Sequence, residues 1–192
     1  MPIVESRLLL MSQPAAAACR RLETQLERCG LKARLGADLF QPSNWHQSLS
    51  DVFEDEPLIE QQLRAAGALL GSSRAVRLMI DRVESRQGPA GVQWAFYSEQ
   101  TPKDFKALRQ SVRSAIQATT GRTSDQPTAH LTISYRAPEH LKRMVLIEPV
   151  EWTLDEVLLV RGGGRPYHYE IIDRWKLQPA RVEQGITQAP LF

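Results

Sequence analysis

Two short histidine-containing segments are the parts of this chain best suited to chemistry. The first reads His46-Gln47-Ser48-Leu49 and the second reads His130-Leu131-Thr132-Ile133. In an extended strand, residues i and i+2 lie on the same face, about 6.5–7 Å apart along the backbone. Each segment is therefore expected to present an imidazole beside a hydroxyl. Two such segments facing each other would suit proton transfer at a phosphodiester.

The residue types indicate how such a site would work. Histidine titrates at about pH 6.5, so one imidazole can act as a base while the other, protonated, acts as an acid. The hydroxyls of Ser48 and Thr132 would donate hydrogen bonds to the nonbridging phosphoryl oxygens. Which histidine is the acid does not follow from the sequence. No Cys/His spacing typical of a metal site occurs, and we expect neither a metal nor another cofactor.

The composition bounds the class of protein. With 192 residues, 42% hydrophobic and 24% charged, the chain is expected to be one globular domain. A net charge of +2 does not by itself indicate a nucleic-acid-binding protein. Cys19 and Cys29 would be about 15 Å apart on one helix and are expected to stay free thiols, as in a cytoplasmic protein. No apolar run approaches the ~20 residues of a membrane span, so no membrane partner is expected.

Hydrophobic periodicity and turn residues predict the elements that position the two segments. Helices are expected at 15–29, 58–70 and 103–119, and strands at 7–11, 45–52, 75–86, 92–97, 129–135, 150–160 and 167–177. This order favours an α+β fold of two pseudo-symmetric lobes, each an antiparallel sheet backed by helices, with a central active-site cleft. We expect residues 1–180 to form this single bilobal domain, residues 181–192 to form a tail, and the protein to be a monomer.

The chain resembles the two-histidine phosphoesterase superfamily and, within it, the RNA 2′,3′-cyclic phosphodiesterases, also called 2′-5′ RNA ligases. The resemblance rests on the two segments and on a closing hairpin that contains Tyr169, and it covers residues 7–177. It implies an enzyme that hydrolyses 2′,3′-cyclic phosphate ends of RNA to a 2′-phosphate, with reversible 2′-5′ ligation. His46, Ser48, His130 and Thr132 would be its catalytic residues.

Two other functions remain open at this point. One is the same chemistry on a small nucleotide, such as a cyclic phosphate of ADP-ribose. The other is a nucleotide- or RNA-binding module without turnover, against which the four intact motif residues argue, because a binder does not need both imidazoles.

Five residues are candidates for substrate binding, and three of them have a structural alternative. Members of the superfamily often carry Arg at the position of Tyr135, and Arg136 would replace it if the strand alternates strictly. Trp45 and Tyr135 would either stack on a base or pack in the core. Arg161, beside the glycines at 162–164, would contact phosphate or lie in a solvated hairpin. Tyr169 belongs to the closing hairpin that the resemblance identifies.

The wall of the cleft and the two remaining histidines give further expectations. Ser50 and Asp51 follow the first segment where the superfamily commonly has an aromatic residue, leucine and glycine, which would alter the wall of the cleft. We expect His140 to be solvated and His168 to have a structural role.

Overall fold

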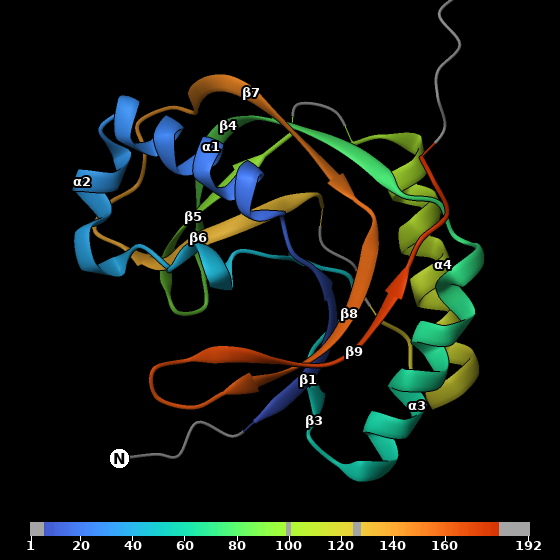
Figure 1. The fold of residues 1–192 in the computed structure, drawn as a ribbon. Coiled ribbons are helices and arrows are strands. Elements are labelled where there is room, and N and C mark those ends of the chain that lie inside the picture. The colour runs from blue at the N-terminus through green and yellow to red at the C-terminus, as the bar shows by residue number, and fades with distance from the viewer. Residues whose placement is uncertain (1–5, 99–100, 125–127, 181–192) are drawn as a thin grey trace, which may run out of the picture.

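A computed structural model describes the chain at residues 6–98, 101–124 and 128–180, and Figure 1 shows its fold. The strands form two antiparallel sheets. The first sheet has the order β2-β1-β8-β9, with β3 pairing with β1, and the second has the order β6-β5-β4-β7. The strands are β1 (Arg7–Ser12), β2 (Gln47–Ser48), β3 (Phe53–Glu54), β4 (Val76–Gly88), β5 (Gly91–Tyr97), β6 (His130–Ala137), β7 (Val145–Leu154), β8 (Glu156–Gly163) and β9 (His168–Lys176).

Each sheet carries one histidine segment on an edge strand. The strand that contains Ser48, β2, ends the first sheet, and the strand that begins at His130, β6, ends the second sheet. These two edge strands contact each other, so the two segments lie side by side. The expected α+β class with two antiparallel sheets is confirmed.

The described residues form four α-helices, three of which pack against the sheets (Figure 1). They are α1 (Ala16–Arg28), α2 (Leu31–Leu35), α3 (Pro57–Ala68) and α4 (Lys103–Thr120), and short 3-10 turns occur at Gly36–Asp38, Pro42–Asn44 and Leu69–Ser72. Helix α1 contacts β7, whereas α3 contacts α4 and the strands β1, β8 and β9. After α4 the chain turns at Gly121, whose φ of +71° is one that glycine adopts without strain. The three helices predicted from the sequence are confirmed to within a few residues.

One hydrophobic core joins the two sheets. Its buried side chains include Leu8 and Leu10 of β1, Leu78 of β4 and Leu131 of β6, together with the inner faces of the helices. A second, smaller cluster lies on the opposite face of the first sheet, where Leu9, Met11, Leu158 and Val160 are buried. That second face is the one that Ser48 shares, because Ser48 is paired with Met11.

Two strand predictions were wrong. The predicted strand 45–52 is replaced by two strands of two residues, β2 and β3, because the chain bulges between them: the backbone N–H groups of Leu49 and Ser50 both donate to the carbonyl of Leu10. The segment between Pro138 and Val150, predicted to be irregular, contains the first half of β7, and the predicted strand 150–160 is divided between β7 and β8, which belong to different sheets. Strand β7 carries Pro149 and is an edge strand, where a missing N–H is tolerated.

Among the described residues, no helix has the length and apolar character needed to cross a membrane. The expected tail, 181–192, lies outside the described residues.

Candidate active site

The two histidines of the repeated segment are held by the same hydrogen bond. His46 Nδ1 lies 2.8 Å from the carbonyl oxygen of Asn44, and His130 Nδ1 lies 2.8 Å from the carbonyl oxygen of Thr128. A carbonyl only accepts hydrogen bonds, so Nδ1 carries the proton in both rings. The neutral form of each imidazole therefore has an unprotonated Nε2, the atom that a general base uses.

The fold brings these rings near each other. His130 is close enough for its charge to lower the pKa of His46, in addition to the larger effect of burial. Burial likewise lowers the pKa of His130, and the nearby Arg86 guanidinium lowers it further. Both imidazoles are therefore neutral in the free protein at neutral pH.

A buried amide connects the two edges on which the histidines lie. The side chain of Gln47, which is 0% exposed, accepts a 2.7 Å hydrogen bond from the backbone N–H of His130. Its Nε2 donates to the carbonyls of Ser48, at 2.8 Å, and Thr128, at 3.4 Å. Gln47 therefore ties the first segment directly to the backbone of the second.

The two hydroxyls lie close to the histidines along the chain, but their settings differ. Ser48 lies above the small apolar cluster on the first sheet. Thr132 Oγ1 accepts a 2.7 Å hydrogen bond from Gln93 Nε2 on β5, and its hydroxyl interacts with the phenol of Tyr135. Because the amide of Gln93 donates to the oxygen, the hydroxyl proton of Thr132 is directed away from β5 and can be donated elsewhere.

An aromatic and a basic residue that the sequence analysis missed flank His130. The buried ring of Tyr97 is stacked on the imidazole, with centroids 5.6 Å apart and planes 18° apart. The guanidinium of Arg86 lies 4.5 Å from the centre of the Tyr97 ring. These side chains come from three adjacent strands, β6, β5 and β4, and their alignment depends on a register in which Tyr97 faces His130.

Tyrosines surround His46 in a similar way. The ring of Tyr169 meets the imidazole edge to face at 4.9 Å, and its hydroxyl lies 3.5 Å from Nε2, at the limit of a hydrogen bond. Tyr167 packs on Tyr169 at 5.4 Å, and Tyr135 interacts electrostatically with both. Burial raises the pKa of Tyr169 well above its usual range, so the phenol stays neutral. The structure thus places the expected residues Tyr169 and Tyr135 beside the two histidine segments, together with Tyr167.

A glycine in the 162–164 segment makes room for this cluster. A Cβ atom at Gly162 would overlap the hydroxyl of Tyr167 and the ring of Tyr169. Gly162 belongs to β8 and is paired with Tyr169. The absence of a side chain at Gly162 allows the two tyrosines to pack there. The sequence analysis placed this glycine in a turn, whereas the structure places it in a strand.

Two of the predicted substrate contacts are wrong. Trp45 is fully buried, packs edge to face on Phe96 and donates its indole N–H to the carbonyl of Phe40, so it is a core residue. Arg161 lies on the opposite face of the first sheet, because it is paired with Leu8, whereas Ser48 is paired with Met11. There it is bound by three carboxylates, Asp55, Glu60 and Glu170.

The expectation for Arg136 depended on strict alternation along its strand, which the structure does not keep. The pairing of β6 with β5 shifts register twice between Thr132 and Ala137. As a result Tyr135, rather than Arg136, interacts with the hydroxyl of Thr132. Arg136 is exposed, and it is placed at the far end of β6 from His130.

The other two histidines lie outside the site. The ring of His140 is exposed, near Ser85 and Gln87. His168 is also exposed, with Nδ1 3.1 Å from the carbonyl of Pro166.

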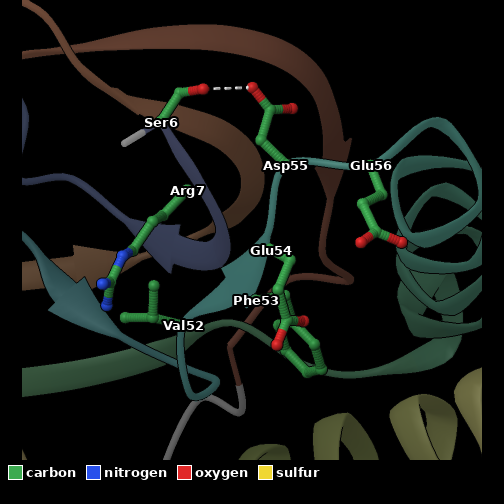
Figure 2. Close-up of a pocket in the computed structure, with 7 residues that line it drawn as sticks. All are labelled: Ser6, Arg7, Val52, Phe53, Glu54, Asp55 and Glu56. Atoms are coloured by element: carbon green, nitrogen blue, oxygen red, sulfur yellow. Dashed lines mark hydrogen bonds between the residues drawn. The ribbon is translucent and has the colours of Figure 1, made fainter. Parts of the chain in front are cut away.

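A separate pocket of about 630 Å³ lies where β1 and β3 meet, and Figure 2 shows it. Its lining contains three consecutive acidic residues, Glu54, Asp55 and Glu56, against a single arginine, Arg7. A phosphate would be repelled there, so this pocket does not compete with the histidine site. Within the described part of the chain, no three His, Cys, Asp or Glu residues are grouped so that they could hold a metal ion.

The fold corresponds to one seen in solved structures, among them E. coli LigT and a structure described as a phosphoesterase. No protein-family model and no curated protein matched this chain in comparisons of its sequence. The correspondence therefore rests on structure.

Three solved structures illustrate it. E. coli LigT in complex with 3′-AMP is 18% identical, with a TM-score of 0.71 over 90% of this chain and 98% of that chain. A crystal structure described as a phosphoesterase is 17% identical, with a TM-score of 0.69 over 92% and 99%. The protein TT0787 of Thermus thermophilus is 18% identical, with a TM-score of 0.68 over 91% and 100%. At these identities the likeness establishes the fold, which is the one that the resemblance to two-histidine phosphoesterases implies.

Proposed function

We propose that this protein is a phosphodiesterase that opens 2′,3′-cyclic phosphate ends of RNA without a metal ion and leaves a 2′-phosphate. The observation that supports this most strongly is the equivalence of His46 and His130. Each presents an unprotonated Nε2, each is followed two residues later by a hydroxyl, and each lies within electrostatic range of the other. The LigT fold is consistent with phosphoester chemistry.

In the proposed reaction one Nε2 removes a proton from water, and the water oxygen attacks phosphorus. The bond from phosphorus to the 3′ oxygen breaks, and the other imidazole, protonated, gives its proton to that oxygen. Ser48 and Thr132 donate hydrogen bonds to the nonbridging oxygens. If a 5′ hydroxyl of RNA replaces water, the product is a 2′-5′ linkage, which is the proposed ligase activity.

The low pKa of both histidines assigns a further role to the substrate. In the free protein burial keeps the rings neutral, so the general acid lacks its proton. A bound phosphodiester anion favours the charged form of a nearby imidazole and raises its pKa. The substrate thus promotes the uptake of the proton that its own leaving group requires.

Arg86 is the proposed cationic contact of the site. The superfamily often has an arginine on the second histidine strand, at the position of Tyr135 in this chain. Arg86 comes from β4 instead, reaches across Tyr97 and affects the pKa of His130. Its side chain is 55% exposed, so it remains accessible to a ligand. The exposed rings of Tyr135 and Tyr167 are the proposed surface for a base.

A small cyclic nucleotide is the second candidate substrate. E. coli LigT, which has this fold, has been crystallised with 3′-AMP, with ATP and with NADP⁺, and these complexes support the proposal of a small nucleotide substrate. An RNA end would gain from additional backbone contacts, which weaken with salt. A strong, salt-sensitive preference for an oligomer would favour RNA, and an equal rate with a mononucleotide would favour the small substrate.

The proposed function is tested with an oligonucleotide that ends in a 2′,3′-cyclic phosphate, incubated with the protein in EDTA. We expect hydrolysis by the unmodified protein and a loss of about 10²–10⁴-fold in His46→Ala and in His130→Ala. Ser48→Ala and Thr132→Ala should lose about 10²-fold or more. His140→Ala and His168→Ala are matched controls and should keep full activity.

Other results would assign the protein differently. Full activity in either motif variant would remove that histidine from the mechanism. Activity abolished by EDTA and restored by a divalent cation would contradict the metal-free reaction. Tight binding of the cyclic phosphate with no turnover would indicate a binding module.

A further inference from the structure

We infer that Gln47 is a positioning residue that fixes the place of His130 relative to His46. Its effect on the reaction rests on the function proposed above, whereas its effect on the geometry of His130 does not. Gln47 occupies the spacer position of the first segment. The corresponding spacer of the second segment is Leu131, an apolar core residue.

The three hydrogen bonds of Gln47 all go to backbone atoms, in the two segments or at Thr128, two residues before the second segment. The Oε1 atom accepts from the N–H of His130, and Nε2 donates to the carbonyls of Ser48 and Thr128. Burying a primary amide without hydrogen-bond partners costs free energy. These three hydrogen bonds therefore allow the side chain of Gln47 to be buried. Since the amide satisfies groups of both segments, it couples their positions.

The side-chain amide of Gln47 bonds to the free edge of β6 much as the backbone of a further strand would. Strand β6 is an edge strand, so part of its backbone has no neighbouring strand to bond with. The amide of Gln47 accepts from residue 130 and donates to residue 128, as a peptide group of an adjacent strand would do. The side chain therefore bridges the edge of the first sheet to the edge of the second at the catalytic histidine.

The contact with Thr128 relates this bridge to the imidazole itself. The carbonyl of Thr128 accepts hydrogen bonds both from Gln47 and from Nδ1 of His130. The amide thus holds the backbone N–H of His130 and also the carbonyl that orients its ring. A displacement of about 1 Å at a reacting group can cost about 10²-fold in rate, so loosening this bridge should slow catalysis while sparing substrate contacts.

The test compares Gln47→Met with Gln25→Met. Methionine keeps a similar length and removes the amide. Gln25 is a matched control because it is also buried, at 7% exposed, and bridges α1 to β7: Oε1 accepts from the N–H of Glu148 at 3.2 Å and Nε2 donates to its carboxylate at 3.2 Å. Thermal unfolding measures the loss of stability in each variant, which we expect to be similar.

Two measurements separate positioning from stability. In steady-state kinetics on the cyclic phosphate, Gln47→Met should lose about 10–100-fold in kcat with KM within about threefold, and Gln25→Met should keep both. In NMR titration of the histidine rings, which needs no turnover, the pKa of His130 should fall further below its ordinary value in Gln47→Met only, because the hydrogen bond from Nδ1 to the carbonyl of Thr128, which raises this pKa, is weakened. The groups that face this ring, Arg86, Tyr97 and His46, are unchanged in both variants.

Gln47→Glu is the conservative variant and covers the case in which Gln47→Met does not fold. Its carboxylate can still accept from the N–H of His130, so kcat should be restored to within about tenfold of the unmodified protein. The added negative charge should raise the pKa of His130 and shift the acidic limb of the rate profile to higher pH.

The inference is overturned if Gln47→Met keeps the kcat and the His130 titration of Gln25→Met. It is also overturned if Gln47→Glu leaves the pH profile and the His130 titration unchanged. If the unmodified protein hydrolyses no cyclic phosphate, the proposed function is wrong. The NMR titration of His130 then remains as the test of whether Gln47 positions that residue.

Discussion

The hydrogen bond from Nδ1 to a carbonyl two residues earlier is the feature that gives His46 and His130 their chemical character. It fixes the tautomer, and burial then holds the pKa of each ring below its ordinary value. Anion binding at this site should therefore be coupled to the uptake of a proton.

Inorganic sulfate, which does not titrate near neutrality, tests this coupling. The free rings are neutral above their lowered pKa values and an anion favours the protonated form, so the complex binds more protons than the free protein. Affinity should rise as the pH falls from about 7.5 to about 5.5, by up to about tenfold per pH unit while one proton is taken up. Isothermal titration calorimetry measures the slope. His46→Gln with His130→Gln should abolish it, and a slope retained in that double variant would place the anion elsewhere.

Arg86 allows a test of the proposed phosphate contact. Arg86→Gln removes the charge beside His130, so KM for a cyclic phosphate should rise about tenfold, an effect of about 1.4 kcal/mol. The pKa of His130 should rise as well, since the guanidinium lowers it. Arg77→Gln, at an exposed position on the same strand, is the control and should leave KM unchanged. An unchanged KM in Arg86→Gln would exclude it from the site.

The sequence predicted part of this site for a definite physical reason. His46, Ser48, His130 and Thr132 occur in a repeated local pattern, so their types and spacing are visible without a structure. Tyr97, Arg86 and Gln93 reach His130 and Thr132 only through the register of β4, β5 and β6, which local patterns do not specify. A turn at 88–91 predicts that β4 pairs with β5, and this was the one available signal for Arg86 and Tyr97.

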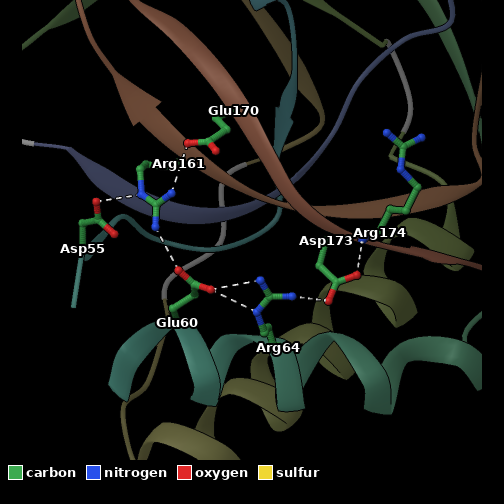
Figure 3. A network of polar contacts seen from close by, with 7 residues as sticks. All are labelled: Asp55, Glu60, Arg64, Arg161, Glu170, Asp173 and Arg174. Atoms are coloured by element: carbon green, nitrogen blue, oxygen red, sulfur yellow. Dashed lines mark hydrogen bonds and ion pairs between the residues drawn. The ribbon is translucent and has the colours of Figure 1, made fainter. Parts of the chain in front are cut away.

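The elements of the fold are held by contacts distinct from the site, as Arg161 illustrates. Figure 3 shows its guanidinium between Asp55, Glu60 on α3 and Glu170 on β9, with Arg64 linking Glu60 to Asp173. This network attaches α3 to the face of the first sheet that is opposite Ser48.

Substitution of Arg161 should consequently affect stability rather than binding. Arg161→Gln should lower the free energy of unfolding by about 1–2 kcal/mol, since partly exposed pairs contribute about 0.2–1 kcal/mol each and three are lost. Urea unfolding measures this loss, which should shrink at high salt. The KM for cyclic phosphate should not change. A tenfold rise in KM with unchanged stability would restore the phosphate contact expected from the sequence.

Helices were predicted better than the strands around the first histidine. The apolar spacing of α4 and the glycine after it are local signals, and the observed Lys103–Thr120 agrees with them. The strand expected at 45–52 depended on a continuous ladder. Instead Ser50 Oγ accepts from the N–H of Leu10, so that a side chain takes the place of a ladder bond. The strand propensity of these residues does not predict this replacement of a backbone hydrogen bond by a side-chain one, because the replacement depends on which strand lies alongside.

At the scale of the whole molecule, the shared core predicts how the protein unfolds. Buried residues of both sheets form one cluster, with no separate apolar core for each half among the described residues. The two sheets should therefore unfold together. Differential scanning calorimetry should show one transition whose calorimetric and van't Hoff enthalpies agree. Two resolved transitions would indicate that each half is stable alone. The expected monomeric state and cytoplasmic location stay predictions.

The identical tethering of the two imidazoles also bears on the direction of the proposed reaction. Neither ring is locked by its backbone contact into donating or accepting at Nε2. Any preference for one direction must therefore come from the neighbours that differ, Tyr169 at His46 and Tyr97 with Arg86 at His130. The way the nucleotide lies between them would decide which oxygen receives a proton. Whether a phosphate end is opened or two strands are joined would then be governed by the relative abundance of water and free 5′ hydroxyls.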